Sequence, residues 1–198
     1  MRFEEFKSSL ENLEKIGEGW RGIVYKAVYN SKQVAVKVAK SPEKEHAIRK
    51  EAEILNALKG NHNFPQILVV GEDFFVYEYV EGTPFEKLNL TQKEKLLVYS
   101  KLLDIAYYLD SIGISRDEFH DLRKNLLIKS DGNLCLMDFD RATFGKGHNL
   151  TQFLQLLRRE GLITHEEAIS LGKEYRKEPK KTYLHLKTLL ERLVQEAT

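Results

Sequence analysis

The spacing of apolar positions predicts strands in the first third of the chain. Residues 1–15 have helical spacing, and Ser8 and Glu11 are placed as a capping box. From residue 16 to 38 β-branched and aromatic residues alternate with polar ones, and a polar turn at 30–32 divides the run in two. This pattern predicts a hairpin of two antiparallel strands that follows a glycine-rich entry.

A helix and a return to strand composition follow the hairpin. Ser41-Pro42 is a favourable helix start, and apolar residues then recur at helical spacing until Gly60. Residues 64–79 are again rich in β-branched and aromatic residues, and Gly82-Thr83-Pro84 ends that run. We expect a domain boundary near residue 80.

The rest of the chain is predicted to be mainly helical. Thr91 and Glu94 form a capping box before a long apolar stripe that ends at Gly113. An irregular polar stretch, 115–124, leads to a short hairpin at 126–138. The remainder reads as helices, one of them capped by Thr164 and Glu167. The fold class is therefore α+β, with a first domain at 1–80 and a second at 81–198.

Composition narrows the class of protein only slightly. The 198 residues include 31 Lys and Arg against 30 Asp and Glu, so the net charge indicates neither a nucleic-acid nor an acidic partner. No apolar run approaches the ~20 residues that span a bilayer, and we expect a cytoplasmic protein without membrane contact. The single cysteine, Cys135, lies in an apolar run and is expected to be a buried thiol.

The first chemical signal is the glycine pattern Gly17-Glu18-Gly19-Trp20-Arg21-Gly22. Glycines at this spacing allow backbone amides to approach phosphate, but the same letters also occur in plain tight turns. Here the pattern lies between two predicted antiparallel strands and not between a strand and a helix. That position favours a flap over nucleotide phosphates.

A lysine and a glutamate extend this signal. Lys37 ends the otherwise apolar run Val34-Ala35-Val36, where a lone ammonium is costly to bury without a carboxylate partner. Glu51 on the following helix is the preferred partner because it lies one turn before Leu55, and Glu53 is the rival. The alternative is that Lys37 and Glu51 are both ordinary surface charges.

With these motifs the chain resembles protein kinases. The flap, the Val-Ala-Val-Lys strand and Glu51 match the glycine loop, the strand lysine and the helix glutamate of that family. Val76 to Gly82 resembles the adenine-binding hinge with Tyr77 as gatekeeper, and Asp138-Phe139-Asp140 is similar to the D-F-G segment. The resemblance implies a bilobal fold with an antiparallel-sheet N-lobe and a reduced, mainly helical C-lobe.

The resemblance also implies cofactors and roles. ATP would bind with Mg²⁺ or Mn²⁺, Lys37 held by Glu51 would pair with phosphates, and Asp138 and Asn125 would bind the metal. The expected nucleotide contacts come from the flap, the neighbouring strands and the hinge: Ile16, Gly17, Glu18, Gly19, Gly22, Val24, Ala35, Lys37, Glu78 and Val80.

The catalytic loop departs from the family pattern H-R-D-L-x-x-x-N. Counting back from Asn125 favours Asp121 as the catalytic acid, although the loop is then one residue short. Counting forward from Gly113 places Glu118 there with a longer loop, and Asp117 matches by letters alone. The three alternatives stay open, with Asp121 preferred, because only one acid can lie within reach of an acceptor hydroxyl.

The third D-F-G position is Asp140, no A-P-E sequence follows, and only 60 residues remain after Asp138. The chain therefore resembles RIO kinases and, more closely, short prokaryotic Ser/Thr kinases. The expected function is ATP-dependent phosphotransfer to a Ser/Thr hydroxyl of a protein or of the chain itself. The alternatives are a nucleotide-binding switch or scaffold without turnover and a small-molecule kinase.

A basic run near the end of the chain suggests a second partner. RNA or a ribonucleoprotein could bind the basic residues Lys173, Arg176, Lys177, Lys180 and Lys181. The interleaved Glu174 and Glu178 favour the plainer interpretation, which is a solvated helix face.

Overall fold

The computed structural model describes residues 1–197, which fall into two compact units. The first unit contains residues 1–82 and 129–142, and the second contains residues 83–128 and the chain from 143 onward. The first has an antiparallel sheet and the second is mainly helical, which confirms the expected α+β class. A single boundary near residue 80 stays a prediction, since residues 129–142 return to the first unit.

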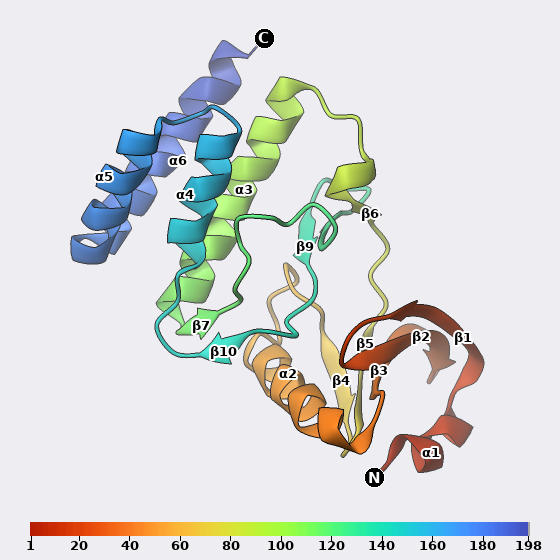
Figure 1. The fold of residues 1–198 in the computed structure, drawn as a ribbon. Coiled ribbons are helices and arrows are strands. Elements are labelled where there is room, and N and C mark those ends of the chain that lie inside the picture. The colour runs from red at the N-terminus through yellow and green to blue at the C-terminus, as the bar shows by residue number, and fades with distance from the viewer. Residues whose placement is uncertain (198) are drawn as a thin grey trace. The chain divides into compact units, whose positions relative to one another are not determined.

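An antiparallel sheet in the order β1-β2-β3-β5-β4 forms the first unit (Figure 1). The expected hairpin is confirmed as β2 and β3, joined by Asn30 and Ser31, which both have positive φ. The strands are β1 Glu11–Glu18, β2 Gly22–Tyr29, β3 Lys32–Ala39, β4 Ile67–Val70 and β5 Phe74–Glu78, with the short β9 Leu134–Leu136 in the returning segment.

The expected helix over residues 1–15 is wrong beyond its first turns. The helical part is α1 Phe3–Phe6 and the 3-10 turn η1 Lys7–Ser9, and the chain pairs with β2 from Glu11 onward. Ser8 does not cap a helix, because its hydroxyl donates to the carbonyl of Glu5. The pairing of β1 with β2 overrides the local helical spacing. The later helix is confirmed as η2 Pro42–Lys44 and α2 Glu45–Ala57.

The sheet has two buried faces because side chains alternate along each strand. Val34, Val36, Phe74 and Val76 lie on the face that packs against Phe3 and Phe6 of α1, among other residues. The intervening positions of the same strands, which include Lys37, Phe75 and Tyr77, lie on the opposite face. Strand alternation therefore brings Lys37 to a face that α1 does not cover.

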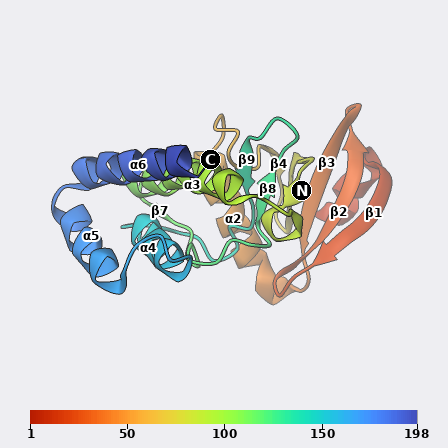
Figure 2. The same cartoon turned by 90° about the horizontal axis from the view of Figure 1, so that it is seen from above.

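Helices dominate the second unit. The capping boxes of Thr91 with Glu94 and of Thr164 with Glu167 are confirmed at the starts of α3 and α5. Helices α3 and α6 run side by side (Figure 2), and the rings of Tyr107 and Tyr183 stack between them at 4.2 Å. The elements are β6 Thr83–Pro84, η3 Phe85–Lys87, α3 Gln92–Ser111, β7 Ile114–Ser115, β8 Leu126–Ile128, β10 Thr143–Phe144, α4 Asn149–Arg159, α5 His165–Lys177 and α6 Pro179–Glu196.

Among residues 1–197, no helix has both the length and the apolar character needed to cross a bilayer.

Candidate functional site

A cavity of about 270 Å³ in the first unit gathers most of the chemically distinctive residues of the sheet and of α2. Its walls come from the flap between β1 and β2, from β3 and β5, from α2, and from the segment after β9. The lining residues are Glu18, Gly19, Arg21, Gly22, Val24, Lys37, Glu51, Leu55, Pro65, Phe75, Tyr77, Met137, Asp138, Phe139 and Asp140.

Lys37 and Glu51 form a buried ion pair in this cavity. Lys37 Nζ lies 2.7 Å from Glu51 Oε1, and the side chains are 13% and 5% exposed. Burial alone lowers the pKa of Lys37, but the attraction and hydrogen bond of Glu51, with Asp140 and Asp138, raise it overall. Lys37 is therefore a fixed cation. The expected partnership is present, and Glu53 is exposed to solvent.

Glu51 also contacts the segment that carries Asp138. Its second oxygen, Oε2, accepts the backbone N–H of Phe139 at 3.3 Å. The Phe139 ring is buried and packs edge-on against Phe64 at 5.7 Å. Asp138 precedes this anchor with φ +63, a strained conformation of the kind that clusters at functional sites. One glutamate thus links the strand lysine to the segment that carries Asp138.

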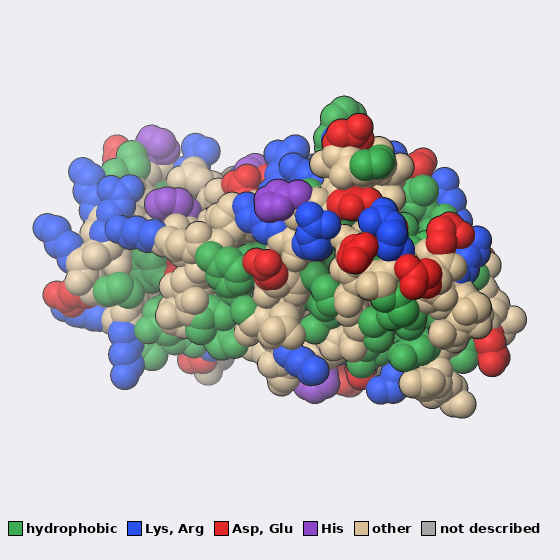
Figure 3. Space-filling view, turned by 90° about the horizontal axis from the view of Figure 1, so that it is seen from below, with side chains coloured by type: hydrophobic (Ala, Val, Ile, Leu, Met, Phe, Trp, Pro, Cys, Tyr) green, Lys and Arg blue, Asp and Glu red, His purple; other side chains and the backbone are tan. Residues whose placement is uncertain are grey.

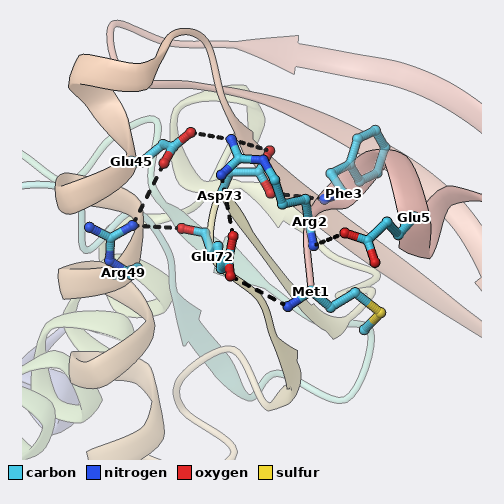
Figure 4. A network of polar contacts seen from close by, with 8 residues as sticks. All are labelled: Met1, Arg2, Phe3, Glu5, Glu45, Arg49, Glu72 and Asp73. Carbon is cyan, nitrogen blue, oxygen red and sulfur yellow. Dashed lines mark hydrogen bonds and ion pairs between the residues drawn. The ribbon is translucent and has the colours of Figure 1, made fainter.

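The helix that carries Glu51 is tied to the sheet at its N-terminal end (Figure 4). The guanidinium of Arg2 pairs with the carboxylates of Glu45 in α2 and of Asp73 before β5. Arg49 of α2 donates to the carbonyl of Glu72 at 2.9 Å. These contacts fix α2 against the turn before β5, and with it the position of Glu51.

The flap needs a glycine at only one of its three sites, Gly22. A Cβ there would lie 2.9 Å from the carbonyl oxygen of Val38 and 3.2 Å from Cγ of Lys37. At Gly17 and Gly19 the nearest atoms to a Cβ are 4.0 and 3.9 Å away, which is ordinary contact. Gly22 therefore lets β2 pass close to the lysine strand.

The charges of the cavity fit a cation better than a bare anion. Among the described residues, Glu18, Glu51, Asp138 and Asp140 supply four carboxylates to the lining, against the two cations Arg21 and Lys37. A free triphosphate would meet excess negative charge, whereas hard oxygen ligands are what Mg²⁺ and Mn²⁺ prefer. The oxygen donors of the lining therefore fit a divalent cation.

The expected nucleotide contacts divide between two places in the first unit. Glu18, Gly19, Gly22, Val24 and Lys37 line the cavity. The others lie outside its lining: Ile16 and Gly17 in β1, Ala35 in β3, and Glu78 and Val80 beside a second cavity of about 450 Å³.

The apolar wall of Leu55, Pro65, Phe75 and Met137 was missed, and so were Arg21 and Asp140. The alternation along β5 could have indicated Phe75, because it shares a face with Tyr77.

In the second unit a buried polar network fixes the start of the acidic loop. The amide of Asn149 accepts the N–H of Arg116 at 2.9 Å and donates to the carbonyl of Ile114 at 2.7 Å. Asp110 in turn accepts from Asn149 at 2.8 Å and from the hydroxyl of Tyr175 at 2.7 Å. Sequence reasoning missed these residues, because their partners lie far along the chain.

The three candidate acids have different surroundings. Asp121 pairs with Arg123 through two contacts, of 2.9 and 2.8 Å, and this hydrogen bonding lowers the pKa of Asp121 to about 2. Asp117 and Glu118 are exposed, both have positive φ, and Asp117 accepts from Gln152 at 3.3 Å.

Asn125 follows in the same unit, where its N–H donates to the carbonyl of Leu122 at 3.2 Å. Its pairing with Asp138 at a metal stays a prediction.

Comparison with known proteins identifies the family. The model of the protein kinase domain matches residues 10–158. YbdM of Bacillus subtilis (strain 168), named a probable serine/threonine-protein kinase, is 30% identical over 150 residues, which cover 65% of this chain and 56% of YbdM. YrzF of the same strain, named a candidate serine/threonine-protein kinase, is 27% identical over 143 residues, which cover 71% of this chain and 64% of YrzF.

A third relative is gdt2 of Dictyostelium discoideum, named a probable serine/threonine-protein kinase. It is 30% identical over 174 residues, which cover 79% of this chain and 10% of gdt2. The chain thus spans less than two thirds of each of these three relatives. Because the family model matches most of the sequence, the chain belongs to the protein kinase domain family.

Proposed function

We propose that the chain is an ATP-dependent phosphotransferase that moves the γ-phosphate of ATP, bound with Mg²⁺ or Mn²⁺, to a Ser or Thr hydroxyl. The observation that carries the proposal is Glu51, which holds Lys37 at 2.7 Å and the N–H of Phe139 at 3.3 Å in one cavity. An ion pair that only stabilised the fold would not need a further carboxylate, such as Asp138, in the same cavity. The names of YbdM and gdt2 as probable serine/threonine-protein kinases support Ser/Thr specificity.

Each residue has a role that follows from its charge. Lys37 is a fixed cation and would bind phosphate oxygens, while Glu51 would hold it in place. Asp138 would hold the metal, with Asn125 as the second ligand, and the metal would neutralise phosphate charge when bound. Val24 and Tyr77 would contact the base, with the backbone of Glu78 and Val80 at the hinge.

The general base is proposed to lie in the pair Asp117–Glu118. These exposed acids are flanked by Arg116 and Phe119, which are buried. Asp121, preferred from the sequence, is a weaker base because its bonds to Arg123 lower its pKa to about 2. A base works best when its pKa lies near the working pH.

Transfer of label from γ-labelled ATP tests the proposal. With Mg²⁺ and the full chain, we expect autophosphorylation or phosphorylation of a generic protein substrate, and Lys37→Met or Asp138→Asn should abolish it. In a second series, Asp117→Asn or Glu118→Gln should reduce transfer strongly, and Asp121→Asn should not. The proposal fails if Lys37→Met transfers phosphate as fast as the wild type.

A nucleotide-binding switch is the second candidate function, favoured by the neutralisation of Asp121 by Arg123. It predicts that nucleotide binds but no label reaches protein or water. A small-molecule kinase predicts label on an added metabolite hydroxyl alone.

The phosphate acceptor is proposed to be a protein or the chain itself, in the cytoplasm. RNA association stays a second proposal, because Glu174 and Glu178 interrupt the basic run and Lys181 pairs with Glu178 at 3.4 Å. Figure 3 shows Lys and Arg side chains beside those of Asp and Glu on one face of the chain.

A further inference from the structure

The two carboxylate oxygens of Asp140 have different surroundings. Its Oδ2 pairs with the guanidinium of Arg21 in the flap at 2.8 Å. Its Oδ1 is buried and has no hydrogen-bond partner, which holds for no other buried side-chain oxygen or nitrogen that the structure describes. Lys37 Nζ lies 3.9 Å from this oxygen, within the range of an ion pair but beyond hydrogen-bond distance.

A buried carboxylate oxygen without a partner is costly, since the protein does not replace the hydration it has lost. The side chain of Asp140 is 19% exposed and lines the cavity. A cation bound beside Asp140 would give this oxygen the partner that it lacks and would offset the cost. The third position of D-F-G, which is usually glycine, thus adds a negative charge where the phosphates would bind.

Asp138 is the neighbouring carboxylate. The N–H of Asp140 donates to Asp138 Oδ1 at 3.2 Å, so the two acids are held on one segment and line one cavity. Mg²⁺ binds through one or two carboxylates and keeps several waters, which suits such a pair. We propose that Asp140 is a second carboxylate ligand, with Asp138, of the divalent cation that accompanies the nucleotide, an inference that rests on the proposed function.

The proposal also implies that Arg21 can exchange its carboxylate partner for a phosphate. When Asp140 binds the cation, its pairing with Arg21 weakens, and the guanidinium becomes available to phosphate oxygens. Arginine suits that exchange, because its planar group binds carboxylate and phosphate in the same forked geometry. The opposing view is that Asp140 serves only to hold Arg21 and the flap.

Manganese binding separates these views without any measurement of activity. Mn²⁺ is titrated into the full chain with saturating ADP. Electron paramagnetic resonance measures the concentration of free Mn²⁺, which gives the affinity. Affinity for ATP is measured separately by calorimetry in EDTA. The variants are Asp140→Asn, Asp140→Gly and Arg21→Gln. The control is Glu53→Gln, which removes one exposed negative charge from α2 outside the cavity.

We expect both Asp140 variants to weaken Mn²⁺ binding by about tenfold or more, since changing even a residue behind a metal ligand commonly costs 10- to 100-fold. Their affinity for ATP in EDTA should be equal or higher, because the cavity loses a negative charge, and this binding also shows that the variants fold. Arg21→Gln should leave Mn²⁺ affinity equal or higher, and Glu53→Gln should match the wild type.

Two results would overturn the assignment while leaving the proposed function intact. In one, the wild type binds nucleotide and Mn²⁺ and both Asp140 variants bind Mn²⁺ as tightly. In the other, Arg21→Gln weakens Mn²⁺ binding as much as Asp140→Asn, which makes Asp140 only a holder of Arg21. If the wild type binds no nucleotide with either metal, the proposed function and the assignment both fail.

Discussion

The Lys37–Glu51 pair offers the sharpest test of the energetics of the site. Lys37→Met removes the cation and keeps an unbranched apolar chain of similar length. Glu51→Gln removes the charge and keeps an oxygen that can accept the N–H of Phe139, now bonded to Glu51 at 3.3 Å. The two single variants and the double variant form a cycle that isolates the charge pair.

The expected magnitude follows from burial. With side chains only 13% and 5% exposed, either single variant leaves one buried charge without its main partner. Such a loss costs about 3–5 kcal/mol, whereas replacing both members of a buried pair is often neutral. At about 2–4 °C per kcal/mol for a chain of this length, a loss of about 3 kcal/mol lowers Tm by about 6–12 °C.

Urea denaturation of the full chain, followed by circular dichroism, measures the cycle. We expect the double variant to be more stable than either single variant, and Glu53→Gln to stay within about 0.5 kcal/mol of the wild type. If the two single effects add within about 0.5 kcal/mol, the residues are uncoupled and the reasoning about the pair is refuted.

The pH dependence of Lys37→Met adds a second check on the same pair. Burial raises the pKa of Glu51 above its usual 4.5, and Lys37 opposes that rise. A carboxyl with a raised folded pKa stabilises the fold most at low pH, and that stability is lost as pH rises through the folded pKa. Without Lys37 the pKa rises further, so Lys37→Met should destabilise the chain less at pH 5 than at pH 8. An equal effect at both values would contradict this account.

Three further predictions concern other parts of the chain. Gly22→Ala should cost about 1–3 kcal/mol in a denaturation experiment, because its Cβ would overpack the lysine strand, and Gly17→Ala should cost much less. The buried Cys135, whose pKa burial raises to about 11, should resist iodoacetamide at pH 8 until the chain unfolds, as mass spectrometry would show. Asp110→Asn, which disturbs several donors, should lower Tm more than Tyr175→Phe, which removes one of them; equal losses would argue against the network.

The sheet and the long helices were predicted well from the sequence. The spacing of apolar residues and the capping residues that indicate them lie within each element and need no partner elsewhere in the chain. Thr91 and Thr164 cap their helices as expected. The first helix was overextended, because residues 11–15 have helical spacing but belong to β1, which pairs with β2. The secondary structure of this segment therefore depends on its pairing with another strand and not on its own sequence pattern.

Residues of the candidate site could be predicted where a charged residue stands in an otherwise apolar stretch of sequence. Lys37 after an apolar run and Glu51 on an amphipathic helix were evident from the sequence. Asn149 and Asp110 could not be found in this way, because they act through partners 33–65 positions along the chain. Asp140 was visible only as a departure from a motif, and its partner Arg21 lies 119 positions away.

The central claim is that the cavity of Lys37, Glu51 and Asp138 binds nucleotide together with a divalent metal. Calorimetric titration of ATP into the full chain, with and without Mg²⁺, tests it most directly. We predict that Mg²⁺ tightens ATP binding in the wild type, that Lys37→Met weakens binding, and that Asp138→Asn removes the effect of Mg²⁺. Absence of ATP binding, or an unchanged effect of Mg²⁺ in Asp138→Asn, would contradict it.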